Sequence, residues 1–233
     1  MEQQYRMAKR LEGLYDGMLR MGSLVEEALR KALIALSNWD EELAGEVIEE
    51  DARIDSTQIE LEDECTDVIA RMQPVGRELR EIVCCIKTLT DLERIGDHAR
   101  HVARSLTKSA GPHYSTMLPR VRQLGNKVLA MVHDSLTALV DRDAEKAREV
   151  AHRDTEDALT VMKTEAQGIE AGQQIILLSR YLERIGDHVT NISASSSTCI
   201  VTMPPKQHNA ASITPTSLYR VSLTQAVSWA NAV

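Results

Sequence analysis

The chain has 233 residues, enough for one large domain or two small ones. It contains no Phe, only 3% of its residues are aromatic, and its apolar residues are mainly aliphatic, so we expect a helical fold and exclude a β-sandwich. All 35 acidic residues and 25 of the 27 basic ones lie within residues 1–193, so this segment has a net charge of −10. Such a charge disfavours binding to nucleic acid and favours binding to cations or to basic protein surfaces.

The sequence gives no sign of export or of membrane insertion. Residues 1–10 mix charges with single apolar residues, unlike the apolar centre of a signal peptide. No stretch approaches the roughly 20 apolar residues of a membrane-spanning helix. We therefore expect a cytoplasmic protein.

The four cysteines are expected to be reduced structural thiols. Cys65, Cys84, Cys85 and Cys199 show no CxxC spacing. Cys84 and Cys85 are neighbours on a predicted helix and therefore point in different directions.

Three helices are predicted in the first half of the chain. Residues 6–37 form the first, because apolar residues recur every seven positions in two interleaved series, which are Leu11, Met18, Val25, Ala32 and Leu14, Met21, Ala28, Ala35. The second follows the break at residues 38–40, carries Asp51 on an otherwise apolar seam, and ends before Pro74 and Gly76. The third covers residues 77–109 and turns apolar residues inward before reaching Glu93.

The same three-part pattern recurs after a linker at Gly111 and Pro112. Apolar residues predict a fourth helix around residues 118–131, a fifth over 147–161 and a sixth over 169–192. The heptapeptide at residues 92–98 is identical to the one at residues 182–188, 90 positions later. Such a repeat indicates an internal duplication.

We therefore predict an all-α fold of two tandem three-helix bundles, at residues 1–109 and 115–195. Asp51 and its counterpart Asp154 are 103 positions apart, so the second copy is 13 residues shorter between its fifth helix and the heptapeptide. From Ala194 the composition changes: the last 40 residues contain no acid and no Gly. We expect no helix there and a largely disordered, low-complexity tail at residues 196–233.

Paired carboxylates in the repeated heptapeptide indicate a metal site in each half. Glu93 and Asp97 are four residues apart and share a helical face, and Glu183 and Asp187 repeat this pair. The acids predicted to face them lie on the preceding helices, and these are Asp51, Asp55 and Asp154. Hard oxygen donors suit Mg, Mn, Ca or Fe. Two further residues could complete the sets, His101 and Asn191, and the histidine favours Fe, Mn or Zn.

An ordinary surface arrangement is the alternative. Arg94 could pair with Asp97, and Arg184 with Asp187, at a spacing of three residues on a solvated face. A glycine inside each heptapeptide, Gly96 and its repeat, costs a helix about 1 kcal/mol relative to Ala and suggests close helix approach or room for a bulky site.

With these motifs located, residues 11–192 resemble the PhoU family of phosphate-uptake regulators. The resemblance rests on Gln73-Pro74-Val75, on residues 91–97, and on residues 181–188 with Asn191-Ile192. It implies a negative regulator of phosphate uptake and of the phosphate-starvation response. Such a protein couples the ATPase subunit of a phosphate transporter to a membrane sensor histidine kinase, attached to the membrane only through its partners.

The resemblance also implies metal sites on the acidic motifs, with iron, zinc, magnesium or manganese as the metal, and we expect a homodimer. Two other functions stay open. A carboxylate-bridged oxidase or phosphatase is disfavoured, because helical di-iron sites use a Glu-x-x-His step, and the acids of the repeated motif do not have a histidine at that spacing. A metal-free structural bundle is the other alternative, and we expect no enzymatic activity.

Overall fold

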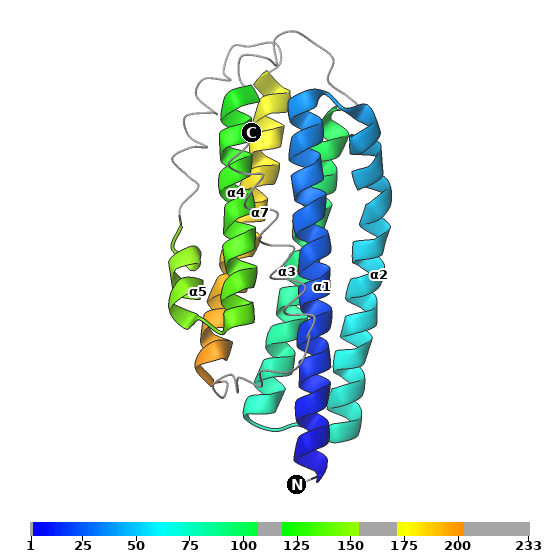
Figure 1. The fold of residues 1–233 in the computed structure, drawn as a ribbon, viewed down its shortest axis with the longest axis vertical. Helices are drawn as coiled ribbons and strands as arrows, with labels where there is room; N and C mark the ends of the chain where they lie inside the picture. The colour runs from blue at the N-terminus through cyan, green and yellow to red at the C-terminus, as the bar shows by residue number, and fades with distance from the viewer. Residues whose placement is uncertain (1, 107–117, 154–171, 203–233) are drawn as a thin grey trace, which may run out of the picture.

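The computed structural model describes residues 2–106, 118–153 and 172–202 (Figure 1). The regular elements in these ranges are α-helices, which confirms the predicted all-α class. They are α1 (Glu2–Asn38), α2 (Glu41–Met72), α3 (Arg77–Leu106), α4 (Leu118–Asp141), α5 (Ala144–Ala151) and α7 (Gly172–Thr202). The five long helices run along the long axis of the molecule, and the short α5 lies beside α4 and α7. None of the helices described is both long enough and apolar enough to cross a membrane.

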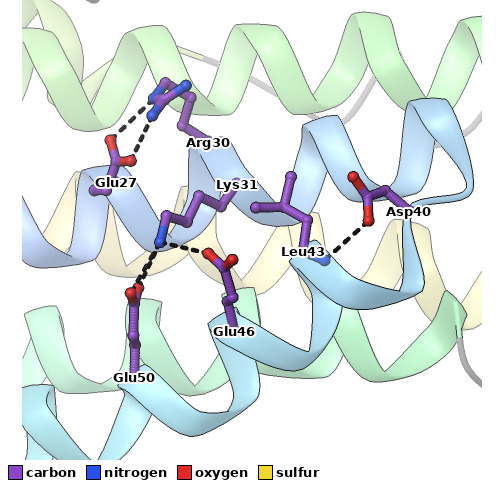
Figure 2. Close-up of polar contacts among 7 residues, drawn as sticks. All are labelled: Glu27, Arg30, Lys31, Asp40, Leu43, Glu46 and Glu50. Atoms are coloured by element: carbon purple, nitrogen blue, oxygen red, sulfur yellow. Dashed lines mark hydrogen bonds and ion pairs between the residues drawn. The ribbon is translucent and has the colours of Figure 1, made fainter.

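The ends of α2 lie where the sequence predicted them. Asp40 caps its N-terminus, because its side chain accepts a hydrogen bond of 2.9 Å from the backbone N–H of Leu43 (Figure 2). Gln73 adopts the left-handed conformation with φ of 49° and donates its N–H to the carbonyl of Ile69, and Pro74 follows, which cannot continue the helix.

Ion pairs join α1 to α2 along their outer edge. The Lys31 ammonium lies 3.1 Å from a carboxylate oxygen of Glu46 and 2.9 Å from one of Glu50 (Figure 2). The hydrogen bond to Glu50 is the main reason that the pKa of Lys31 is raised, although burial opposes it. Lys31 therefore links α1 to the N-terminal part of α2.

The two halves are bundles that share one hydrophobic core. Helices α1, α2 and α3 all contact one another, as do α4, α5 and α7, and the bundles meet where α1 packs on α4 and α3 packs on α7. Large side chains from both halves are fully buried in this core, among them Met18, Met21, Leu92, Ile95, Leu124 and Met131. The burial of this aliphatic surface is the main term that stabilises the fold.

Glycines permit close approach at two of these contacts. A Cβ atom added to Gly96 of α3 would lie 3.0 Å from Cδ1 of Ile54 on α2, so the predicted close packing around the repeated glycine is confirmed in the first half. A Cβ added to Gly22 of α1 would lie 2.8 Å from Cδ2 of Leu136 on α4. Both contacts are tighter than ordinary van der Waals packing allows for a larger residue.

The prediction of a fifth helix over residues 147–161 is wrong at its C-terminal side. Helix α5 ends at Ala151, where the N–H of His152 bonds to the carbonyls of Arg148 and Glu149 and closes the last turn. Polar contacts hold this short helix to α4: Asp134 lies 3.0 Å from Nζ of Lys146 and 2.5 Å from Nη1 of Arg153. Residues 154–171, which include the predicted ligand Asp154, lie outside the described residues.

The prediction that helical structure stops at Ala194 is also wrong, because α7 continues to Thr202. Two side chains of this extension, Cys199 and Ile200, are buried. Hydroxyl groups of Ser197 and Thr198 donate back to the carbonyl of Ala194, so polar residues fit a helix despite their low propensity. Residues 107–117, with the predicted linker, and 203–233, most of the predicted tail, lie outside the described residues.

Candidate functional site

The acids of the first half converge between α2 and α3. Asp51 lies on the apolar seam of α2, one helical turn from Ile54, and is buried with 5% of its surface exposed. The Glu93 side chain is 17% exposed. Burial raises the pKa of Glu93, and the nearby carboxylates of Asp97, Asp55 and Asp51 raise it further, whereas Arg94 lowers it. Asp51, Glu93 and Asp97 therefore lie near one another, whereas Asp55 is exposed, and their role as metal ligands stays a prediction.

Two arginine side chains pair with three carboxylates of this cluster. The Nε atom of Arg100 lies 2.9 Å from Oδ2 of Asp51, and the same guanidinium group pairs with Asp97. Burial raises the pKa of Asp51 even though Arg100 opposes this rise. The guanidinium of Arg94 lies 3.5 Å from Glu93 and 3.6 Å from Asp97, so the alternative pairing considered from the sequence is present as well.

Sequence reasoning missed Arg100. It stands three residues after Asp97 and seven after Glu93, so it shares their helical face, and this spacing could have identified it. Among the residues that the structure describes, no group of three His, Cys, Asp or Glu side chains is arranged to hold a metal ion. The carboxylates have the oxygen chemistry that a hard cation requires, but the Arg100 guanidinium lies between two of them.

In the second half, the aspartate that matches Asp97 is far more exposed. Nη1 of Arg184 lies 3.8 Å from Oδ2 of Asp187, and these side chains are 65% and 56% exposed, as expected for a solvated helical face. The Asp97 side chain is only 20% exposed. Glu183 is half-buried and Asn191 is exposed. The two heptapeptides are identical in sequence, yet their aspartates differ in solvent exposure.

Equivalent residues of the two copies meet where α3 crosses α7. His98 and His188 occupy the same position in the two heptapeptides, and their rings stack with centroids 5.9 Å apart. Asp91 and Tyr181 are also equivalent positions, and each contacts the histidine of the other copy. An oxygen of Asp91 lies 2.9 Å from Nδ1 of His188, and the ring of Tyr181 stacks on that of His98 with centroids 6.0 Å apart. The contact between α3 and α7 therefore has approximate two-fold symmetry, a feature that could have been inferred from the repeat itself.

The predicted ligand His101 belongs to this aromatic cluster. Its ring stacks on Tyr181 of α7, with centroids 5.0 Å apart and an interplanar angle of 16°. Burial, with the neighbouring His188 and His101, lowers the pKa of His98 to about 4, so His98 is neutral at pH 7. The structure thus places His101 against the second half of the molecule, and its role in a metal site stays a prediction.

The outer face of α2 is strongly acidic. This helix carries 12 Asp or Glu residues and two Arg residues over 32 positions. It packs on α1 and α3 and lies at the edge of the molecule (Figure 1), so most of these carboxylates face outward. The charge asymmetry found in the composition is therefore concentrated on one surface.

Comparison with known proteins matches both halves of this architecture. The PhoU domain family model matches residues 18–106 and 121–195. The phosphate-specific transport system accessory protein PhoU homolog of Clostridium acetobutylicum is 36% identical over 197 residues, which cover 80% of this chain and 90% of that protein. The homolog of Pseudomonas aeruginosa is also 36% identical over 197 residues, with coverages of 78% and 80%.

Solved structures agree with the fold. The crystal structure of the phosphate transport system regulatory protein PhoU from Streptococcus pneumoniae superposes with a TM-score of 0.75 at 26% identity and covers 86% of this chain and 100% of that one. PhoU from Pseudomonas aeruginosa gives a TM-score of 0.74 at 32% identity, with coverages of 84% and 99%. The resemblance inferred from the repeated motifs is confirmed.

Proposed function

Because the chain belongs to the PhoU family, we propose that it is a regulatory accessory protein of phosphate transport that restrains phosphate uptake and the phosphate-starvation response. The observation that carries this proposal is the match of the PhoU domain to both halves of the chain. The names of the relatives, an accessory protein and a regulatory protein of phosphate transport, support it.

Deletion of the gene tests this role directly. A strain without the protein should express a phosphate-starvation reporter in phosphate-rich medium, and a plasmid copy of the chain should restore repression. Normal repression in the deletion strain would contradict the proposal. The protein acts by binding and not by catalysis, so repression should depend on its surfaces and not on turnover of a substrate.

The acidic face of α2 is the surface proposed to dock on partners. It suits basic surfaces on the cytoplasmic side of a phosphate transporter, at the ATPase subunit, and on a sensor histidine kinase. Attachment to the membrane is then peripheral and the protein itself cytoplasmic. Exchange of three exposed acids, Glu49, Glu60 and Asp63, for Lys should weaken capture of these partners from membrane fractions.

A charge-matched variant controls for net charge. Lys at three exposed acids on other helices, Glu12, Glu145 and Glu149, changes the total charge equally and should leave capture intact. Equal loss in both variants would show that total charge matters and the α2 face does not. Binding through this face should also weaken as salt rises. Light scattering of the purified chain checks the predicted homodimer.

We also propose that the acid cluster of the first half binds a metal ion, with Fe, Zn, Mn or Mg as the candidates. Asp51, Asp55, Glu93 and Asp97 would supply oxygen ligands, and a bound cation would replace the Arg100 guanidinium as their counter-charge. The ligands proposed for a second site are Glu183, Asp187, Asn191 and Asp154. Solvent exposure of Asp187 makes the first cluster the better candidate.

Elemental analysis of protein purified without chelators tests the metal proposal. Glu93→Gln should lower the metal content, and Glu183→Gln is the matched change in the second copy. Absence of metal from the wild-type protein after incubation with each cation would contradict the proposal and leave the regulatory role standing. Loss of metal in Glu183→Gln but not in Glu93→Gln would make the second cluster, not the first, the better candidate for the metal site.

A further inference from the structure

Two cysteine thiols from opposite halves of the chain, Cys84 on α3 and Cys199 on α7, lie close together where these helices pack on one another. The Sγ atom of Cys84 on α3 donates a hydrogen bond of 3.6 Å to the carbonyl of Ser195, which precedes Cys199 on α7 by one helical turn. The Cys84 and Cys199 thiols are close enough to shift each other's pKa, with Cys84 raised and Cys199 lowered. From α1, the hydroxyl group of Tyr15 lies 3.8 Å from Sγ of Cys199. All four cysteines of the chain are free thiols in the structure.

This pair exists because α7 extends beyond Ala194. Cys199 lies past residue 195, where the match to the family ends, and it is 6% exposed. Cys84 is half-buried, so solvent reaches one member of the pair. The adjacent Cys85 is buried on another face of α3, as expected for consecutive helical residues.

The surroundings of the pair favour a thiolate at Cys199. Hydrogen bonds from Cys84 and Tyr15 lower the pKa of the Cys199 thiol, and Arg142 acts in the same direction, while burial and Glu81 oppose this. The contact with Cys199, together with burial, raises the pKa of the Cys84 thiol. By contrast, burial raises the pKa of Cys85 and makes it a poor nucleophile.

We propose that Cys84 and Cys199 form a reversible disulfide in response to a peroxide, which links α3 to the end of α7 and so fastens one bundle to the other. The Cys199 thiolate attacks one oxygen of hydrogen peroxide, the O–O bond breaks, and the departing hydroxide takes a proton and leaves as water. The Cys84 thiol then attacks the sulfur of the resulting sulfenic acid, loses its proton, and releases a second water as the S–S bond forms. The two thiols are oxidised together, and the peroxide is reduced to water.

Formation of this bond requires the two sulfur atoms to approach to about 2 Å, the length of an S–S bond. Cys84 already contacts the helical turn that carries Cys199. The bond would close a loop from residue 84 to residue 199 and so restrict the unfolded chain over about half of its length. Oxidation should therefore raise the urea concentration at which the protein unfolds.

Peptide mapping of the full-length protein tests the proposal. The reduced chain is freed of dithiothreitol, exposed to hydrogen peroxide, alkylated, and digested with trypsin without reduction. We expect peptide 81–87 to be joined to peptide 185–206, with the loss of two hydrogen atoms, and dithiothreitol should restore the separate peptides. The urea midpoint should rise on oxidation and return on reduction.

Matched variants identify the cysteine on α3, since peptide 81–87 contains both Cys84 and Cys85. Cys84→Ala and Cys199→Ala should each abolish the link and the rise of the urea midpoint, while Cys85→Ala and Cys65→Ala should keep both. Far-UV circular dichroism of each variant verifies that it is folded.

Several results would overturn the proposal. One is a disulfide link to peptide 54–71, which contains Cys65. Another is a disulfide between two copies of the chain, and a third is sulfinic acid on peptides that are not linked. Persistence of the link in folded Cys84→Ala would do the same.

Discussion

Replacement of Arg100 by Met should destabilise the protein by about 2 kcal/mol at pH 7. Arg100 pairs with two carboxylates, Asp51 and Asp97, and Met keeps most of its volume without its charge. Removing one partner of a fully buried ion pair costs about 3–5 kcal/mol, because the other charge stays buried and uncompensated. The side chains of Arg100 and Asp97 are 24% and 20% exposed, so solvent screens part of this loss and we expect about half of it.

The loss should depend on pH in a defined direction. Burial already raises the pKa of Asp51, and removal of its nearest cation raises it further. A carboxyl group whose pKa is higher in the folded state binds more protons when folded, so stability increases as pH falls between the folded and unfolded pKa values. The deficit of Arg100→Met should therefore be complete at neutral pH and disappear below about pH 4, near the pKa of Asp in an unfolded chain.

Urea unfolding followed by circular dichroism at several pH values measures this effect. Arg94→Met is the matched control, because Arg94 contacts Glu93 and Asp97 from a side chain that is 56% exposed, and its loss should cost less than about 1 kcal/mol. Equal stability of Arg100→Met and wild type at pH 7, or a deficit that grows as pH falls, would refute the reasoning that the buried carboxylates depend on Arg100.

Three further predictions concern contacts between helices. Gly22→Ala should lose about 1 kcal/mol in urea unfolding, since overpacking costs about 1–3 kcal/mol against a helix-propensity gain near 1 kcal/mol; Gly13→Ala, with open space around it, should gain stability instead. A double-mutant cycle of Asp91→Ala and His188→Ala should give a coupling of about 1 kcal/mol, and a coupling near zero would mean that this bond does not join the halves. Although burial opposes it, hydrogen bonds from Arg153 and Lys146 lower the pKa of Asp134. The contribution of Asp134 is therefore complete above the ordinary Asp pKa of about 3.9 and is lost as pH falls through the lowered value. Asp134→Asn should therefore be less stable than wild type at pH 7, by about 0.5–1 kcal/mol, and equal to it near pH 2.

Much of the first half could be predicted from the sequence because its signals are local. The seven-residue spacing of apolar side chains identified α1 and α2, and the break at residues 38–40 and Gln73-Pro74 marked the ends of α2. Asp51 was predicted on an apolar seam and is buried there. Periodicity of this kind fixes which face of a helix is buried, whatever that face then packs against.

The end of α7 shows where local signals fail. Residues 194–202 are rich in Ser and Thr and have low helix propensity, yet they are helical because Cys199 and Ile200 are buried. The opposite error occurred at the fifth helix, which was predicted to run through Asp154 but ends at Ala151. Apolar periodicity alone does not show where a helix stops.

The sequence by itself determined the helical class, the internal duplication, and the faces that carry Asp51, Glu93 and Asp97. Only the tertiary structure decided that Arg100 pairs with Asp51 across the two helices, and that Cys84 lies beside the helical turn that carries Cys199. It also decided that Asp187 is exposed whereas its counterpart Asp97 is half-buried. The physical reason is distance along the chain. A residue's helical face follows from its nearest neighbours, whereas its burial and its charge partners depend on side chains that folding brings from far away.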